Sequence, residues 1–146
     1  MQEETPLATV IYSVKIAKDI KELRKRYRSI TRDIQSFAKQ LEFGEITGDR
    51  IIGNKYPVFK ARIKNSDIQK GKSGGYRVIY YTVIADEILL ATVYSKSDQS
   101  DTSNQEIEEI IEQELELIES IQLSQSNSIL EQAESESEEQ TNQKPD

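Results

Sequence analysis

Basic residues alternate along one short segment of this chain in a pattern suited to binding phosphate. Lys60, Arg62 and Lys64 are each separated by one residue, in a stretch that reads as a β-strand starting at Tyr56. Successive side chains of a strand point to opposite faces, so we expect the three cations to share one face and apolar residues to form the other. Such a concentration of positive charge favours a phosphate-bearing ligand.

A glycine-rich turn, Gly71–Gly75, leads from this strand into a second one, Tyr76–Ala85. Antiparallel pairing of the two strands would place Arg77 beside the cations of the first strand. The turn contains Gly-Lys-Ser but is not a phosphate-binding P-loop, because the earlier glycine of that motif is missing and a strand follows instead of a helix. We expect Lys70 and Lys72 to contact backbone phosphates.

The cations could instead be the solvated face of a half-exposed sheet. Two more cations, Arg77 and Lys96, favour the functional interpretation, because like charges on neighbouring strands repel each other unless an anion offsets them. Tyrosines more often pack than stack on bases. We nevertheless select Tyr94, which closes the third strand just before Lys96, as a candidate catalytic residue, and Tyr76 as a candidate nucleic-acid contact.

Charge is distributed unevenly along the 146 residues. The whole chain has a net charge of −7, but residues 103–146 hold 13 acids and one base, which gives −12. Residues 1–102 hold 18 bases and 13 acids and are therefore at +5. A basic body joined to an acidic segment leaves a nucleic-acid partner possible.

The composition excludes several kinds of chemistry. With no cysteine and no histidine, the chain has no thiolate nucleophile, no imidazole base and few ways to bind zinc. Catalysis would have to use Lys, Arg, Tyr or carboxylates, and we expect no cofactor and no metal. No apolar run is long enough to span a bilayer, so we expect a cytoplasmic protein without a membrane partner.

Apolar spacing predicts an α+β fold. Two helices, Ile16–Tyr27 and Ile30–Leu41, form an αα-hairpin that ends near Gly44. The segment that follows, up to Lys55, reads as a loop. The predicted sheet is small, twisted and antiparallel, with the helix pair packed on one face. Its four strands are Leu7–Ser13, the two strands described above and Glu87–Tyr94.

A third helix is predicted over Ser103–Leu123, where isoleucine and leucine recur at helical spacing between glutamates. Beyond it the chain has few apolar residues to offset the entropy of ordering. We therefore divide the chain into a domain, residues 1–123, and a disordered acidic tail, residues 124–146.

Three blocks carry a family resemblance: Lys60–Lys64, Gly71–Tyr80 and Tyr94–Asp98. In this order and spacing they resemble the RelE-like branch of the RelE/ParE superfamily of toxins from bacterial toxin-antitoxin systems, over roughly Leu7 to Ile118. The resemblance implies a small sheet with an N-terminal helix pair. It also implies an endoribonuclease that cuts mRNA, commonly on the ribosome, and is held inactive by a cognate antitoxin, through which a homo-oligomer could form.

The resemblance also implies roles for the candidate residues. Arg77 would clamp the scissile phosphate, because its planar fork can bind two oxygens. Lys60, Arg62 and Lys64 would position the RNA and stabilise negative charge, with one lysine as base, and Tyr94 or Lys96 would be the acid. The RelE pattern commonly ends with an arginine and a later tyrosine, but Ser97, Gln99 and Asn104 stand in that region here.

Two other functions fit the same fold. ParE-like relatives resemble RelE toxins but act on DNA gyrase, and a toxin fold can also persist as an inactive binding module. The Arg77 and lysine constellation favours the nuclease. The three functions predict different results: cuts in mRNA for the nuclease, inhibition of supercoiling for the gyrase inhibitor, and neither for the inactive binding module.

Overall fold

We describe the protein from a computed structural model that covers residues 5–69, 71, 73–83, 86–99 and 101–142. The α+β prediction is confirmed. The chain forms two compact units, Met1–Ile111 and Glu112–Asp146. The elements, in chain order, are β1 (Thr9–Tyr12), α1 (Val14–Leu23), α2 (Ile30–Glu42), β2 (Asp49–Arg50), β3 (Val58–Ile63), β4 (Tyr76–Val83), β5 (Glu87–Ser95) and α3 (Asn104–Asn142).

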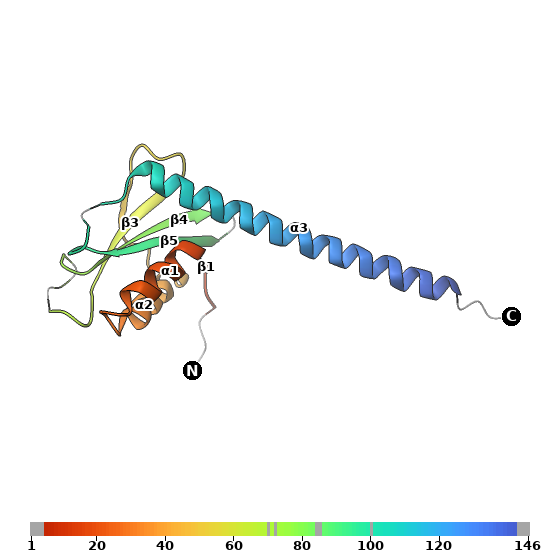
Figure 1. Cartoon of the computed structure of the whole chain (residues 1–146), viewed down its shortest axis with the longest axis horizontal. Coiled ribbons are helices and arrows are strands. Elements are labelled where there is room, and N and C mark those ends of the chain that lie inside the picture. Colours follow the sequence, from red (N-terminus) through yellow and green to blue (C-terminus); the bar gives the residue numbers. More distant parts are fainter. Residues whose placement is uncertain (1–4, 70, 72, 84–85, 100, 143–146) are drawn as a thin grey trace. The chain divides into compact units, whose positions relative to one another are not determined.

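The sheet has the strand order β1-β5-β4-β3-β2, and β3, β4 and β5 form the predicted antiparallel meander (Figure 1). Two features differ from the prediction. Strand β1 pairs with β5 in parallel, and the short strand β2 lies within the segment predicted as a loop. Pairing direction depends on a partner distant in sequence, so the local pattern of β1 does not contain it.

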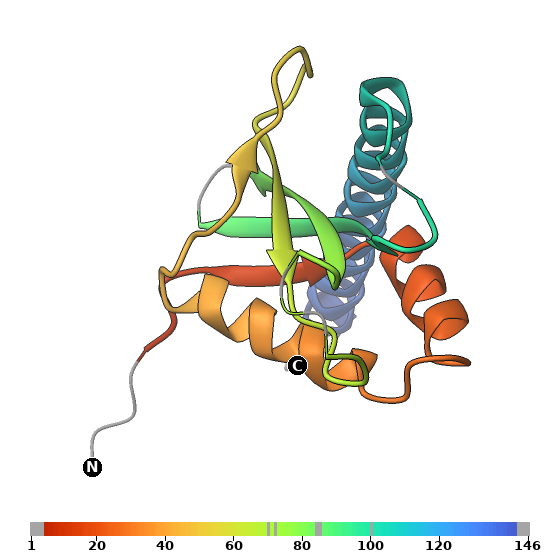
Figure 2. The ribbon, with the colours of Figure 1, turned by 90° about the vertical axis from the view of Figure 1, so that its left-hand side faces the viewer.

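Helices α1 and α2 cover one face of the sheet, which we call the inner face; α2 runs along it in Figure 2. Ile16, Ile34 and Phe37 of the helices pack with sheet residues that include Ala61 and Val78. By strand alternation the neighbours of these sheet residues point to the opposite, outer face. The hairpin therefore leaves the outer face for other contacts.

Two polar side chains fix α1 to β5. Ser13 caps α1, because its Oγ accepts the N–H of Ile16 at 2.9 Å, and the same hydroxyl donates to the carbonyl of Ala91 at 2.7 Å. One turn later, the Asp19 carboxylate accepts from the hydroxyl of Thr92 at 2.5 Å. These bonds hold the end of β5 that leads to Tyr94.

Helix α3 extends further than predicted. It continues past Leu123 to Asn142, through a segment expected to be a disordered tail. Neither Gly nor Pro interrupts residues 104–142, and Glu, Gln and Leu are good helix formers. The side chains from 121 to 134 are exposed, so this stretch is helical without a buried face.

The loop before β4 depends on the absence of a side chain at Gly75. A Cβ there would lie 2.1 Å from the carbonyl oxygen of Ile63, which is far inside van der Waals contact. We predict that Gly75→Ala lowers the free energy of unfolding by about 2 kcal/mol or more and the Tm by about 5 °C or more, measured by thermal melting.

Gly71→Asn is the matched control in the same loop. A Cβ at this position meets no atom within 4 Å, and Asn tolerates the φ of +65°. Equal melting temperatures for the two variants would contradict the packing argument.

Candidate nucleic-acid interface

Strand register brings three candidate residues into one row on the outer face. Arg62 of β3 pairs with Arg77 of β4, and Arg77 pairs with Tyr94 of β5. Side chains directly opposite each other in such pairs have Cβ atoms roughly 5 Å apart. Lys60 points to the same face, and with Arg62 it lines a pocket of about 270 Å³ beside Asp49. The predicted proximity of Arg77 to the β3 cations is thus confirmed for Arg62, whereas Lys60 lies opposite Ile79, two residues further along β4 from Arg77.

The turn before β4 positions the guanidinium of Arg77. Its Nη2 donates to the carbonyl of Ser73 at 2.9 Å and its Nη1 to the carbonyl of Tyr76 at 3.4 Å. The side chain is 6% exposed. Backbone carbonyls therefore help to hold a positive charge directly opposite Arg62, where repulsion would otherwise destabilise the pair.

Asp101 lies beside the cations of this row, and the sequence analysis did not single it out. Its Oδ1 lies 3.3 Å from Nζ of Lys60. The backbone N–H of Thr102 lowers the pKa of Asp101 below its ordinary 3.8, Lys60 and Lys96 lower it further, and partial burial opposes them. A search for acids among the cations could have singled out the second aspartate after Lys96, but only the fold shows that it reaches β3.

Tyr94 places a phenol next to these charges. It is 5% exposed, and among the described residues its hydroxyl has no hydrogen-bond partner of acceptable geometry. Burial raises the pKa of Tyr94 above its ordinary 10.0, the nearby Asp101 carboxylate adds to the rise, and Arg77 opposes it. Tyr94 is therefore neutral at physiological pH and has a proton to donate.

Lys96 lies in the turn after β5, which two contacts hold. Its N–H donates to the carbonyl of Gly75 at 3.0 Å, so the turn adjoins the loop that positions Arg77. Two residues later, Asp98 forms an ion pair with Arg26, which follows α1. The Lys96 side chain is exposed and close enough to Asp101 to affect the pKa of that carboxylate.

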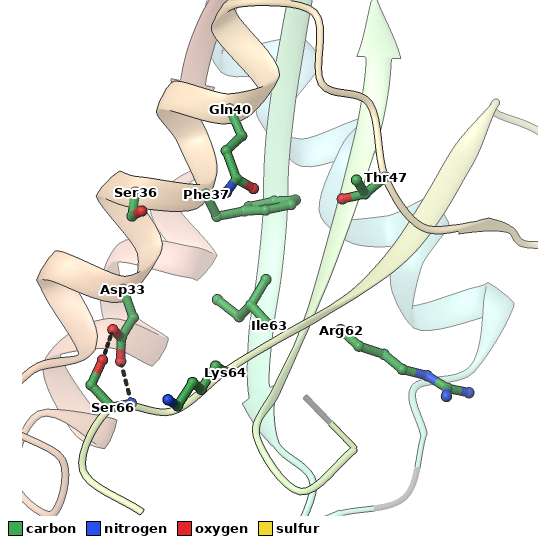
Figure 3. A pocket seen from close by; sticks show the side chains of 9 residues that line it. All are labelled: Asp33, Ser36, Phe37, Gln40, Thr47, Arg62, Ile63, Lys64 and Ser66. Atoms are coloured by element: carbon green, nitrogen blue, oxygen red, sulfur yellow. Dashed lines mark hydrogen bonds between the residues drawn. The ribbon is translucent and has the colours of Figure 1, made fainter. Parts of the chain in front are cut away.

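Lys64 points in a different direction from Arg62, contrary to the prediction that three alternating cations share a face. Strand β3 ends at Ile63, so the alternation is not maintained by pairing at Lys64. Figure 3 shows Lys64 turned toward α2 and Arg62 turned away from it. Lys64 and Arg62 both line a pocket of about 250 Å³ beside α2. In this pocket Asp33 accepts hydrogen bonds from the N–H and the hydroxyl of Ser66.

Tyr76 also lies apart from the cluster. It is fully buried among the core residues of the inner face, with its ring edge to face with Tyr27 at 5.9 Å between centroids. Because Tyr76 precedes Arg77 in a strand, the two side chains must point to opposite faces. Lys70 and Lys72 lie outside the described residues.

The described part of the chain holds no group of three or more acidic, histidine or cysteine side chains placed to bind a metal ion. Within the same residues, no helix is both long and apolar enough to cross a bilayer.

Comparison with known proteins identifies the family. No curated protein matches the chain. The family described as the RelE toxin of the RelE/RelB toxin-antitoxin system matches residues 14–136. That span covers both helices of the hairpin, the meander with its basic row and most of α3. The match begins later than the resemblance read from the sequence blocks but extends further toward the C-terminus, into much of the acidic segment, and on this basis the chain belongs to the RelE toxin family.

Proposed function

We propose that this RelE-family toxin is an endoribonuclease that cleaves mRNA on the ribosome and thereby inhibits translation. The family match supports the toxin role. The observation that carries the proposal is the row of Arg62, Arg77 and Tyr94 on one face of the sheet, with Lys60 beside it. This row combines phosphate-binding cations with a proton donor.

In the proposed reaction an RNA 2′-hydroxyl attacks the adjacent phosphorus and gives its proton to the unprotonated amine of one lysine of the cluster. The bond from phosphorus to the 5′-oxygen breaks, and a 2′,3′-cyclic phosphate remains. The step needs cations that stabilise charge on the phosphorane, and it needs no metal if side chains supply them. The planar fork of Arg77 is suited to binding two phosphate oxygens, but the residue is only 6% exposed and both Nη atoms donate to backbone carbonyls, so we propose that docking of the RNA uncovers it. A phosphate between Arg62 and Arg77 also relieves the repulsion between them.

Tyr94 is our proposed general acid. It is neutral at physiological pH, it lies directly across from Arg77, and its hydroxyl lies near enough to Asp101 for that carboxylate to raise its pKa. It can therefore donate its proton to the leaving 5′-oxygen. Lys60 and Lys96 stabilise the anionic oxygens, and Lys64 serves as a peripheral cation for a longer RNA.

The expected partners follow from the family. RelE toxins pair with antitoxins, and we propose a cognate antitoxin whose acidic residues cover the cations of the outer face. We also propose a cytoplasmic location, because the proposed substrate is translated there.

Loss of Arg77 should abolish most of the activity. We predict that Arg77→Ala lowers the rate of mRNA cleavage about 100- to 1,000-fold, because the scissile phosphate loses its bidentate cation. Arg77→Lys, which keeps the charge but not the fork, should also cut more slowly than wild type. Cleavage is measured by mapping mRNA ends after incubation with translating ribosomes, and melting curves verify folding.

Arg28→Ala is the matched control, because Arg28 is exposed in the turn between α1 and α2. It should cut at the wild-type rate. Undiminished cleavage by folded Arg77→Ala would contradict the nuclease site. Inhibition of gyrase supercoiling without mRNA cuts would support the ParE-like alternative instead.

Tyr94→Phe should separate chemistry from folding. We predict a loss of about 100-fold or more in cleavage rate, with a free energy of unfolding that is unchanged or higher by up to about 1 kcal/mol, because the removed hydroxyl is buried without a partner.

The pH profile tests the same assignment. The raised pKa keeps Tyr94 protonated, so the ratio of wild-type to Tyr94→Phe rates should stay constant between about pH 6 and about pH 9. It should fall only as the pH rises above 10.0, when the phenol loses its proton. If wild type and Tyr94→Phe cleave at nearly equal rates over the whole pH range, Tyr94 is not the acid.

A further inference from the structure

We propose that Asp101 is an internal anion that occupies the phosphate position beside Lys60 in the RNA-free protein, and that RNA must displace it. This inference rests on the proposed binding of RNA to the outer face. It gives the Asp101 carboxylate a regulatory role on a face that otherwise presents cations to anionic ligands.

The position of the carboxylate supports this role. Asp101 Oδ1 lies 3.3 Å from Lys60 Nζ, and the two side chains are 66% and 28% exposed, respectively. Asp101 is thus the more solvent-accessible partner of the pair, and its carboxylate also lies near the hydroxyl of Tyr94. Lys96 is also close enough to interact with Asp101, so the carboxylate has two cationic neighbours, as a bound phosphate would.

The segment that presents Asp101 is stabilised mostly by bonds within itself. Gln99 Nε2 donates to the carbonyl of Asp101 at 3.1 Å and to Thr102 Oγ1 at 3.1 Å, and the Thr102 N–H donates to Asp101 Oδ1 at 2.9 Å. Breaking the exposed ion pair with Lys60 should reduce affinity only about two- to fivefold.

A small penalty of this kind would favour extended RNA over single phosphates. A single anion gains Lys60 but must break the contact with Asp101. An RNA strand offers further phosphates to Arg62, Arg77 and Lys96 at the same time, so its binding outweighs the loss. Asp101 would therefore reduce occupancy of the site by mononucleotides and free phosphate.

Asp101→Asn tests the proposal in the full-length protein. Asn keeps an Oδ1 acceptor for the Thr102 N–H but removes the negative charge. The probe is an RNA oligonucleotide made uncleavable by 2′-deoxy substitution, and its affinity is measured by fluorescence anisotropy across a salt series. Asp101→Glu restores the charge and should restore an affinity close to wild type.

The control is Asp86→Asn, which changes the net charge by the same amount. Asp86 precedes β5 at the opposite end of that strand from Tyr94, and Asn tolerates its φ of 63°. We expect Asp101→Asn to bind about two- to fivefold more tightly than this control at low salt. Its plot of log affinity against log salt should be steeper by about 0.7, because Lys60 then releases a counterion when RNA binds.

Equal affinity and equal salt slope for the two variants would overturn the proposal. So would loss of cleavage by Asp101→Asn without a gain in affinity, which would make Asp101 a group used in the chemistry. If wild-type binding is insensitive to Arg77→Ala, the proposed function fails as well. If Arg77→Ala abolishes RNA binding but Asp101→Asn does not raise the affinity, only the proposal that Asp101 is an internal anion is wrong.

Discussion

The pairing register between β3 and β4 is the constraint on which the candidate site depends. Gly75 permits it, because the backbone at this position approaches the carbonyl oxygen of Ile63 more closely than any side chain would allow. The same register pairs Arg62 with Arg77 and, one strand further, Arg77 with Tyr94. A slip of one residue would send Arg77 into the apolar core and bring Tyr76 to the surface.

A cluster of like charges must be stabilised by something other than packing. Here the carbonyl oxygens of the turn accept from Arg77, and the carboxylate of Asp101 accepts from Lys60. These partners differ in exposure: the Arg77 contacts are buried, whereas the Asp101 contact is open to solvent. The structure therefore combines a fixed cation at the centre of the row with a neighbouring cation whose partner an incoming phosphate can replace.

The sequence predicted features that depend on local pattern. The apolar stripe of α2, its end near Gly44 and the meander were predictable from periodicity and glycine positions, and the proximity of Arg62 to Arg77 followed from them. The predictions failed for features that depend on residues distant in sequence. The direction of β1 depends on β5, and Asp101 meets Lys60 only after folding. The burial of Tyr76 was predictable, because successive side chains of a strand point to opposite faces and Arg77 was expected on the cationic face.

We propose that Lys60, Arg62, Arg77, Tyr94 and Lys96 form one site that binds the RNA backbone. An NMR titration of labelled protein with an uncleavable RNA oligonucleotide tests it most directly. We expect the amide signals that shift to belong to β3, β4 and the end of β5 around these residues, and we expect the exposed surface of α1 and α2 to be unaffected. Shifts confined to the helix pair, or no shifts at low salt, would contradict it.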